Sequence, residues 1–369
     1  MKKPCSPLIG IETFSGAGGM SLGLIEAGID VRFAFDIDSK AVDTYRTNIS
    51  DHCHVRDIRH INGREIFDII GLDEIDVLSG GPPCQGFSKQ RKGAHLGADE
   101  RNDLVREYAR LIEEVRPRSF IFENVQVFGQ KRGRELIDFM KEQLSEYQIY
   151  RFFVYASDFG LAQRRSRFLM IGIRKDVSTL IPVLGMADRI QTVRDAIGDL
   201  PPPPEDHTEH KDFPNHIKCR ITPLNEQRFR HVPQGGGWLD IPEHLRLNCH
   251  NGVDRTKGGW PDVYGRLEWN GQAPTITAGF DSFTRGRYGH PEQHRSLTLR
   301  EGARLQGFPD DFRFCGTRYD VRLQIGNAVP PPLASAVGKA IIRVLKNDGR
   351  MPRFPVWPEG FSQILQAAE

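Results

Sequence analysis

Residues 8–28 combine an apolar strand, a glycine-rich loop and a helix, and this unit constrains the fold more than any other stretch of the chain. Leu8 to Phe14 is an apolar run that leads into Ser15-Gly16-Ala17-Gly18-Gly19. Apolar residues then recur at helical spacing from Met20 to Ala27, and Gly28 is a typical helix stop. The pattern predicts a strand and a helix joined by a tight glycine loop.

A second predicted strand, Val31 to Phe35, ends on Asp36, twenty positions after Gly16. An acidic side chain at this point can accept hydrogen bonds from a pair of ribose hydroxyls. The glycine loop departs from G-x-G-x-x-G and suits a nucleoside ligand without a pyrophosphate, such as S-adenosyl-L-methionine. An ordinary strand–helix turn is the alternative. Asp57 ends a third predicted strand and could reach an adenine amino group, although a solvated acid explains it equally well.

The stretch 80–88, Gly80-Gly81-Pro82-Pro83-Cys84-Gln85-Gly86-Phe87-Ser88, follows the apolar run Ile75 to Leu78. It predicts a strand that ends in a stiff loop, because prolines fix φ and glycines let other atoms approach the backbone. Such a loop can present Cys84 as a nucleophile. A tight turn with a small buried cysteine is the alternative. The polar stretch 89–99 predicts a loop that closes over a ligand.

Glu123 follows the predicted strand Ser119 to Phe122. A carboxylate at the carboxyl end of a buried parallel strand lies where open α/β sheets bind ligands, and burial there can raise its pKa. An N-cap or a solvated acid is the alternative. Helical spacing of apolar residues predicts helices around 104–115 and 137–144, with a further strand over 152–156.

An arginine pair precedes the apolar run Phe168 to Ile173, in the sequence Gln163-Arg164-Arg165-Ser166-Arg167. If the strand continues through this segment, alternation places Arg165 and Arg167 on the same face. An edge strand with solvated arginines is the alternative.

Residues 191–294 differ in texture from the rest of the chain, and Pro201–Pro204 is a rigid marker near the boundary. They are rich in Gly, Pro and His, and their 12 lysines and arginines against 14 acids give a net charge of −2. They are therefore not basic as a whole. The local elements 228–231 and 284–287 could still meet phosphates or base edges, although structural salt bridges explain such arginines equally well.

Periodicity returns at the C-terminal end of the chain. Thr298 and Glu301 form a capping-box pattern for a helix that Gly307 and Pro309 end. Arg300, Glu301 and Arg304 are expected to pack one domain against the other. A last helix is predicted from Gln324 through Val344, and the tail after residue 346 is expected to be a loose surface segment.

The composition is that of a globular, water-exposed protein, with 38% hydrophobic and 27% charged residues and a net charge of +2 over 369 residues. No signal-peptide core or membrane-length apolar run is evident, which predicts a cytoplasmic protein. The six cysteines form no C-x-x-C pair, and His52-Cys53-His54 has no second ligand pair. Free thiols and no metal site are therefore predicted.

The chain resembles the DNA (cytosine-5)-methyltransferase family, in its bacterial and phage restriction-modification type, from about Ile9 to Ile342. The resemblance rests on six segments in order and on the variable segment that precedes the fifth. These segments are Phe14–Gly19, Pro83-Cys84-Gln85, Glu123-Asn124-Val125, Gln163–Arg167, Arg304-Leu305-Gln306-Gly307-Phe308-Pro309 and Gln324-Ile325-Gly326-Asn327.

This resemblance implies a Rossmann-like S-adenosylmethionine-dependent methyltransferase fold, α/β in class, with a smaller, irregular target-recognition domain. The catalytic and cofactor-binding domain is expected over 1–190 and the target-recognition domain over 191–294. Residues 295–345 are expected to return to the catalytic domain, and 346–369 to form the tail.

The resemblance also implies an activity, a DNA (cytosine-5-)-methyltransferase (EC 2.1.1.37). The nucleophile is Cys84 and the acid is Glu123, with Arg165 and Arg167 as further catalytic arginines, Arg165 on the pyrimidine oxygen. Asn124 is expected to help fix the Cys84 loop. The implied residues of the S-adenosyl-L-methionine site are Phe14, Ser15, Gly16, Ala17, Gly18, Gly19, Asp36, Ile37, Asp57, Ile58, Pro83, Leu104, Asn327 and Ala328.

The implied partner is double-stranded DNA, from which the target cytosine is flipped out of the stack. A cognate restriction endonuclease, a monomeric enzyme and no membrane partner are expected. Two alternatives stay open: a tRNA cytosine-5 methyltransferase of the same fold, and a binding relative without catalysis. Against the first, the loop continues as Gly86-Phe87-Ser88 and the variable segment lacks a Cys-Phe-Thr signature. Against the second, Cys84 and Glu123 are both present.

Overall fold

The computed structural model describes residues 6–83, 99–250 and 262–360. The chain forms two compact units. Unit 1 comprises residues 1–159, 166–188 and 329–369, and unit 2 comprises residues 160–165 and 189–328.

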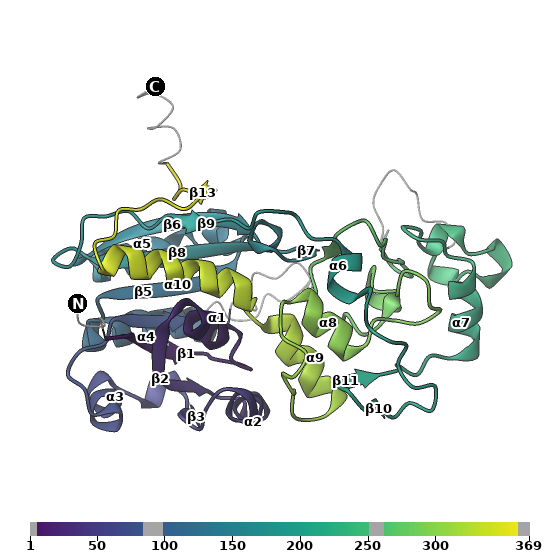
Figure 1. The fold of residues 1–369 in the computed structure, drawn as a ribbon, viewed down its shortest axis with the longest axis horizontal. Coiled ribbons are helices and arrows are strands. Elements are labelled where there is room, and N and C mark those ends of the chain that lie inside the picture. Colours follow the sequence, from purple (N-terminus) through teal and green to yellow (C-terminus); the bar gives the residue numbers. More distant parts are fainter. Residues whose placement is uncertain (1–5, 84–98, 251–261, 361–369) are drawn as a thin grey trace, which may run out of the picture. The chain divides into compact units, whose positions relative to one another are not determined.

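Unit 1 is built on a seven-stranded sheet of order β3-β2-β1-β4-β5-β8-β6 (Figure 1). The first five strands in this order pair in parallel, whereas β8 is antiparallel to both of its neighbours. The predicted mostly parallel α/β fold is therefore confirmed. The strands are β1 Leu8–Thr13, β2 Ile29–Asp36, β3 Cys53–Val55, β4 Val77–Gly80, β5 Ser119–Val125, β6 Tyr147–Tyr155 and β8 Ser166–Arg174.

Helices cover the sheet because each central strand is apolar on both faces, as buried parallel strands require. All residues of β4 and six of the seven in β5 are buried. Figure 1 shows α10 in front of the strands and α4 and α5 behind them. The helices are α1 Gly19–Ala27, α2 Ser39–Asn48, α3 Gly63–Ile70, α4 Asp99–Val115, α5 Arg134–Gln143 and α10 Pro331–Leu345.

Helices α1 and α4 end where the sequence predicts. Gly28 ends α1 in the left-handed conformation, with φ 102°, and α4 ends at Val115, two residues before Pro117. The first helix also packs closely on α10, since a Cβ atom added at Gly23 would lie 2.2 Å from the Pro331 carbonyl oxygen. The backbones of α1 and α10 therefore meet at a position that only glycine can occupy without displacement.

Unit 2 has little regular structure. Among its described residues, the strands pair in two-stranded sheets, β10 with β11 and β7 with β12. Its elements are β7 Gln163–Arg164, α6 Val193–Ile197, β10 Glu209–His210, β11 Phe213–Ile217, α7 Pro223–Arg230, β12 Ala273–Pro274, α8 Leu299–Leu305 and α9 Arg318–Asn327.

The capping box predicted for α8 is confirmed, because Thr298 and Glu301 exchange both hydrogen bonds. Glu301 also forms a buried ion pair with Arg295, at 2.7 Å. Arg300 donates to the carbonyl oxygens of Pro214, Pro309 and Phe312. These charged residues therefore hold unit 2 together internally, whereas they were predicted to join two domains.

Three C-terminal predictions need correction. The chain returns to unit 1 at Val329 and not at residue 295, because α8 packs on α6 and β11 within unit 2. The predicted single helix from Gln324 is two helices, broken by extended backbone at Ala328 and Pro330. The tail is not wholly loose, since β13 (Pro355–Val356) pairs with β9 (Leu184–Gly185).

The segment Arg318–Leu345 is long and apolar enough to pass as a membrane span by composition, with a mean hydropathy of 1.2. It contains both α9 and α10, and 67% of its most apolar window is buried in the protein. The burial assigns this apolar character to the protein core.

Replacing Gly23 with alanine should lower the free energy of unfolding by roughly 1–3 kcal/mol, because overpacking against Pro331 outweighs the gain in helix propensity. Urea unfolding followed by circular dichroism measures the change. Gly349→Ala is the matched control, since a Cβ atom at Gly349 meets nothing within 4 Å. Equal stabilities of the two variants would contradict the close approach of α1 and α10.

Candidate active site

The carboxyl ends of the parallel strands bring the predicted site residues of unit 1 to one edge of the sheet. Asp36 is the last residue of β2, Gly80 ends β4, and Glu123 lies near the end of β5. Parallel neighbours end at the same edge, so Asp36 and Glu123, 87 positions apart in sequence, lie along one edge of the sheet, with β1 and β4 between their strands. A side chain at Gly80 is excluded, because its Cβ atom would lie 2.2 Å from Thr13 Oγ1.

The glycine loop turns sharply between β1 and α1. Phe14, Gly16 and Gly18 all have positive φ angles, of 53°, 51° and 92°. Ser15 is buried, and its amide donates to the Phe35 carbonyl oxygen, which ties the loop to β2. Gly18 must be glycine for a second reason, since a Cβ atom there would lie 2.8 Å from the Tyr45 ring. Ala17 and Gly19 are buried in the same turn.

Asp36 is held by two backbone amides. Its Oδ2 accepts from Gly16 N at 2.8 Å, and its Oδ1 accepts from Asp38 N at 2.9 Å. Desolvation raises the pKa of Asp36, against the opposing effect of these two hydrogen bonds. Each carboxylate oxygen keeps a second lone pair. The geometry therefore fits a carboxylate that accepts hydrogen bonds from a ribose hydroxyl pair.

The residues after β2 and β3 add an apolar and an acidic group beside this carboxylate. Ile37 is 67% exposed, which is unusual for an isoleucine next to a buried strand end. Asp57 caps the short 3-10 helix Ile58–His60 and pairs with Arg59 at 2.6 Å. The hydrogen bond from Arg59 lowers the pKa of Asp57. Ile58 is buried, so it supports the turn and offers little side-chain surface to a ligand.

Phe14 and Leu104 are both half-buried, and both pack against the main apolar core of unit 1. Their placement fits aromatic and aliphatic contacts to a nucleoside, because each side chain keeps part of its surface accessible.

The loop that carries the predicted nucleophile is described up to Pro83, and Cys84 lies outside the described residues. Pro82 is buried and Pro83 is exposed. Asn124 Nδ2 donates to the Pro82 carbonyl oxygen at 3.0 Å, a buried hydrogen bond across 42 residues of sequence. A Cβ atom at Gly81 would lie 3.2 Å from Glu123 Oε2. The start of the Cys84 loop is therefore fixed beside the Glu123 carboxylate.

Glu123 forms a buried ion pair with Arg167, with 2.6 Å between Oε1 and Nε. Their side chains are 11% and 10% exposed. Burial lowers the pKa of Arg167, and the neighbouring Glu123 carboxylate opposes that effect. Strand β8 makes the contact, since Arg167 pairs with Val125 in the antiparallel register of β5 and β8. A fixed carboxylate and guanidinium can together hold the polar edge of a pyrimidine.

The prediction that Arg165 and Arg167 share one face of a strand is wrong. Arg165 lies between β7 and β8, so the alternation is broken there. Its guanidinium is buried in unit 2, where it donates to the carbonyl oxygens of Ile276, Gly326 and Ala328. Arg165 therefore fixes local backbone, and Arg167 is the arginine placed next to Glu123.

Asn327 and Ala328 end α9 in unit 2, where Asn327 is exposed and Ala328 is buried. Glu12, which was not predicted as a site residue, lies buried in β1 directly before the glycine loop. An acid inside the apolar run 8–14 was the available signal for it. Of the residues described, no group of three His, Cys, Asp or Glu is arranged to hold a metal ion.

The two arginine-containing elements of unit 2 divide into internal and exposed residues. Arg228 donates to the Leu245 carbonyl oxygen, and Arg230 pairs with Glu226. Arg287 pairs with Asp262 and donates to three carbonyl oxygens. Arg285 is exposed, and within the described part of unit 2 no acid forms an ion pair with it.

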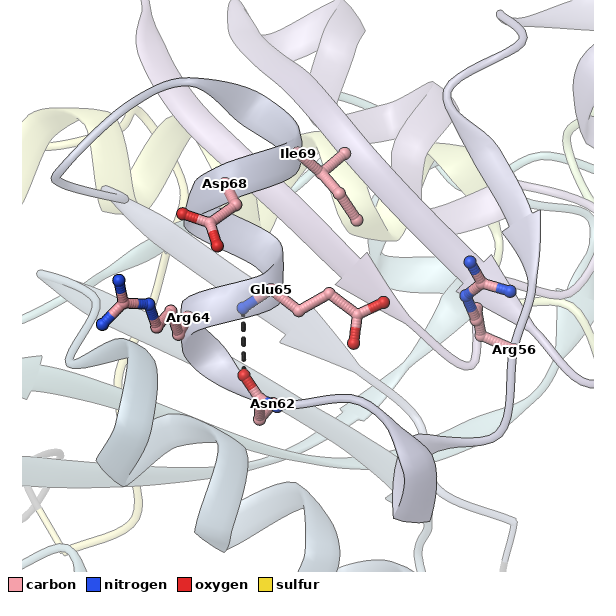
Figure 2. A pocket seen from close by; sticks show the side chains of 6 residues that line it. All are labelled: Arg56, Asn62, Arg64, Glu65, Asp68 and Ile69. Carbon is pink, nitrogen blue, oxygen red and sulfur yellow. Dashed lines mark hydrogen bonds between the residues drawn. The ribbon is translucent and has the colours of Figure 1, made fainter.

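A surface pocket of about 500 Å³ lies beside α3, away from these residues. Figure 2 shows Glu65 extending from α3 toward Arg56, with Arg64 on the opposite side. Asn62 Oδ1 accepts from Glu65 N and caps the helix. None of the predicted donor-site residues lines this pocket, so it is distinct from the candidate site.

Comparisons with known proteins agree with this arrangement. The family model "C-5 cytosine-specific DNA methylase" matches residues 8–343. The type II methylase M.HgiDII of Herpetosiphon aurantiacus is 35% identical, over 91% of this chain and 95% of its own length. The type II methyltransferase M1.HphI of Haemophilus parahaemolyticus is 34% identical, over 93% and 89%. A solved E. coli prophage protein, described as a DNA modification methyltransferase, has 29% identity and a TM-score of 0.69, over 92% and 99%.

Replacing Arg167 with methionine should lower the free energy of unfolding by about 3 kcal/mol, because Glu123 is left buried without its ion-pair partner. Urea unfolding at pH 7 measures the loss. Adding Glu123→Gln to this variant should restore part of it, since the uncompensated charge is removed.

The control for this cycle is Arg116→Met, which removes the partner of Glu146 from an ion pair of 2.9 Å whose side chains are 61% and 60% exposed. That change should cost less than about 1 kcal/mol. If Arg167→Met cost no more than Arg116→Met, the buried pair would not be fixed as described.

Proposed function

Because the chain belongs to the C-5 cytosine-specific DNA methylase family, and so is a DNA (cytosine-5)-methyltransferase, we propose that it methylates C5 of a cytosine flipped out of a specific duplex sequence. The observation that carries this proposal is the joint anchoring of two elements at one sheet edge. Asn124 holds the Pro82 carbonyl two residues before Cys84, and the same strand presents the buried Glu123–Arg167 pair.

Catalysis begins at Cys84, because cytosine C5 is too weak a nucleophile to take a methyl group directly. The Cys84 thiolate adds to C6 while Glu123 engages N3 and the amino group, and the ring becomes an enamine-like anion whose nucleophilic carbon is C5. After methylation, water takes the C5 proton, the electrons of the C5–H bond restore the double bond between C5 and C6, and the bond from C6 to Cys84 breaks to release the thiolate. Arg167 binds the pyrimidine oxygen and stabilises the anionic character of the adduct.

The residues of the glycine loop and of the strand ends hold S-adenosyl-L-methionine. The bound donor supplies the electrophilic sulfonium methyl group. Asp36 binds the ribose hydroxyls, Asp57 the adenine amino group, and Phe14, Ile37 and Leu104 the apolar surfaces of the nucleoside. The proposed backbone and C-terminal contacts come from Ser15, Gly16, Ala17, Gly18, Gly19, Ile58, Pro83, Asn327 and Ala328.

The target base must leave the helix before Cys84 can reach C6, at a cost of a few kcal/mol of lost stacking and pairing. Residues 89–99 are proposed to close behind the flipped base. Residues 191–294 are proposed to recognise the target sequence. The enzyme is proposed to act as a cytoplasmic monomer. A restriction endonuclease of the same specificity is proposed to accompany it, because the names of its relatives are those of type II methylases.

Cys84→Ser should lower methyl transfer to duplex DNA by about 10³-fold or more, because a neutral hydroxyl adds to C6 far less readily than a thiolate. Transfer of labelled methyl groups from the donor measures the rate, with duplex DNA and tRNA as parallel substrates. Circular dichroism and donor binding by calorimetry should remain unchanged in this variant.

Three results would overturn the proposal. Undiminished turnover in Cys84→Ser would exclude the thiolate mechanism. Transfer by the wild-type protein to tRNA alone would favour the tRNA methyltransferase of the same fold, and absence of transfer to either substrate would favour a binding relative.

Arg285 is the proposed DNA contact within the element 284–287. It lies at the end of the 3-10 helix Phe283–Arg285, which is anchored by the stacked rings of Phe283 and Phe229, with centroids 4.3 Å apart. Ser296 Oγ also accepts from Phe283 N, at 3.0 Å. A rigidly held cation without an acidic partner among the described residues can meet a phosphate or a guanine edge at little cost in conformational entropy.

Arg285→Ala should weaken DNA binding several-fold and, if Arg285 meets a phosphate, reduce the slope of log affinity against log salt by about 1. Fluorescence anisotropy with duplex DNA at several salt concentrations measures both. Arg230→Ala is the matched control, because Arg230 is exposed but already paired with Glu226. Equal losses in the two variants would contradict a specific role for Arg285.

A further inference from the structure

Helix α9 packs along the segment 277–285, which carries Arg285. A Cβ atom added at Gly326 would lie 2.4 Å from the Ala278 backbone nitrogen, so the C-terminal end of the helix lies directly on this segment. A second close contact, at Asp281, holds the N-terminal end of the helix. The first turn of α9 and the proposed DNA contact therefore belong to one rigid part of unit 2.

The Asp281 carboxylate is the centre of this second contact, and two arginines of α9 share it. Asp281 is buried, and its Oδ2 accepts from Arg318 Nε at 2.8 Å. Its Oδ1 accepts from Arg322 Nη1 at 3.5 Å. One buried negative charge thus faces two positive charges, and the cluster keeps a net positive charge.

The two segments that meet at this cluster are positive in an acidic surrounding. Segments 281–287 and 317–322 together contain four arginines and two aspartates. One aspartate is the buried acid of the cluster, and the other, Asp320, caps α9. Arg287 is paired with an acid outside both segments, so the other three arginines leave an excess positive charge. Because residues 191–294 as a whole have a net charge of −2, this local excess marks where a polyanion can bind.

The Arg318 guanidinium is firmly oriented, but not all of its donors are used. Its Nε and Nη2 donate to the carboxylate and to the carbonyl oxygen of Asp281, at 2.8 and 3.0 Å. Its Nη1 makes no hydrogen bond within residues 6–83, 99–250 and 262–360, and the side chain is 46% exposed. A buried acid thus fixes the guanidinium plane. The unused nitrogen can bind an anionic oxygen with little further loss of conformational entropy.

Tyr319, the next residue, presents an aromatic ring on the same turn. It is 57% exposed, so the ring does not serve the core of unit 2. The guanidinium carbon of Arg322 lies 4.7 Å from the ring centroid, and Arg322 is itself held by Asp281. This cation–π contact fixes the ring without covering it. The Tyr319 hydroxyl has no hydrogen-bond partner in the described part of the chain, so it stays free for a ligand.

We propose that Arg318 and Tyr319 form a second DNA contact of unit 2, joined through Asp281 to the element that carries Arg285. Arg318 Nη1 donates to a phosphate oxygen, and the Tyr319 ring packs on a neighbouring deoxyribose while its hydroxyl donates to a phosphate. Neither side chain reads a base edge, so this contact positions the duplex and leaves sequence recognition to other residues. The inference rests on the proposed function, because it requires duplex DNA as the substrate.

The test is duplex DNA binding by the full-length protein, measured by fluorescence anisotropy at several salt concentrations. Arg318→Ala should weaken binding several-fold and reduce the slope of log affinity against log salt by about 1, because one phosphate loses its cation. Tyr319→Ala should weaken binding several-fold with an unchanged slope, because it removes no charge. Tyr319→Phe should lose less affinity than Tyr319→Ala, since the ring remains.

Each position has a matched control elsewhere on the surface. Arg313→Ala removes an exposed arginine of unit 2 that is paired with Glu209. Phe354→Ala removes an exposed ring of unit 1 whose centroid lies 4.9 Å from the guanidinium carbon of Arg353. Both controls should bind DNA with wild-type affinity and slope.

Folding is checked in every variant by circular dichroism and by calorimetric binding of S-adenosylmethionine. Arg318→Ala removes one partner of a buried acid and can lower stability. Tyr319→Ala removes no buried polar group, so it tests the surface even where Arg318→Ala does not fold.

The outcomes separate this inference from the function on which it rests. Losses in Arg318→Ala and Tyr319→Ala no greater than those of their controls would overturn the second DNA contact, and a salt slope unchanged by Arg318→Ala would overturn the phosphate contact. Absence of both duplex binding and methyl transfer in the wild-type protein would instead contradict the proposed function.

Discussion

The parallel pairing of β2, β1, β4 and β5 is the constraint on which the candidate site depends. In a parallel sheet every strand ends at the same edge. Asp36, Gly80 and Glu123 therefore lie along one edge, although the helices and loops that connect their strands differ in length. Thr13 and Tyr108 leave no room for a side chain at Gly80. This close packing fixes the end of β4 next to β1. The start of the loop that leads to Cys84 is therefore fixed beside the Glu123 carboxylate of β5.

The single strand that runs antiparallel to its neighbours, β8, lies between β5 and the edge strand β6 and has its own consequence. Strand β8 runs opposite to β5, which brings Arg167, at its start, beside the carboxyl end of β5. A buried ion pair seldom adds net stability, because desolvation of both charges offsets their attraction. The Glu123–Arg167 pair is better explained by orientation. It holds a carboxylate and a guanidinium side by side, where the polar edge of a ring can contact both.

Much of unit 1 could be predicted because its signals are local. Apolar runs and glycine stops define its elements within a few residues of sequence, as Thr298 and Glu301 do for α8 in unit 2. The misses depend on long-range contacts. No local pattern shows that Arg165 turns toward Ile276 and Ala328, or that the packing of α8 on α6 and β11 keeps 295–328 in unit 2. The helix break at 328–330 was available locally, since three consecutive prolines follow Val329 and disfavour helix in the residues before them.

The buried arginines of unit 2 explain why its net charge of −2 carries little information about DNA. A domain with few strands has many backbone carbonyls that no ladder satisfies, and a guanidinium offers five donors in a fixed plane. Arg266 donates to four such carbonyls and Arg300 to three more, and burial lowers the pKa of each to about 10. These cations act as cross-links in place of secondary structure. The charge that can reach DNA is therefore set by individual exposed cations such as Arg285, and not by the sum over the domain.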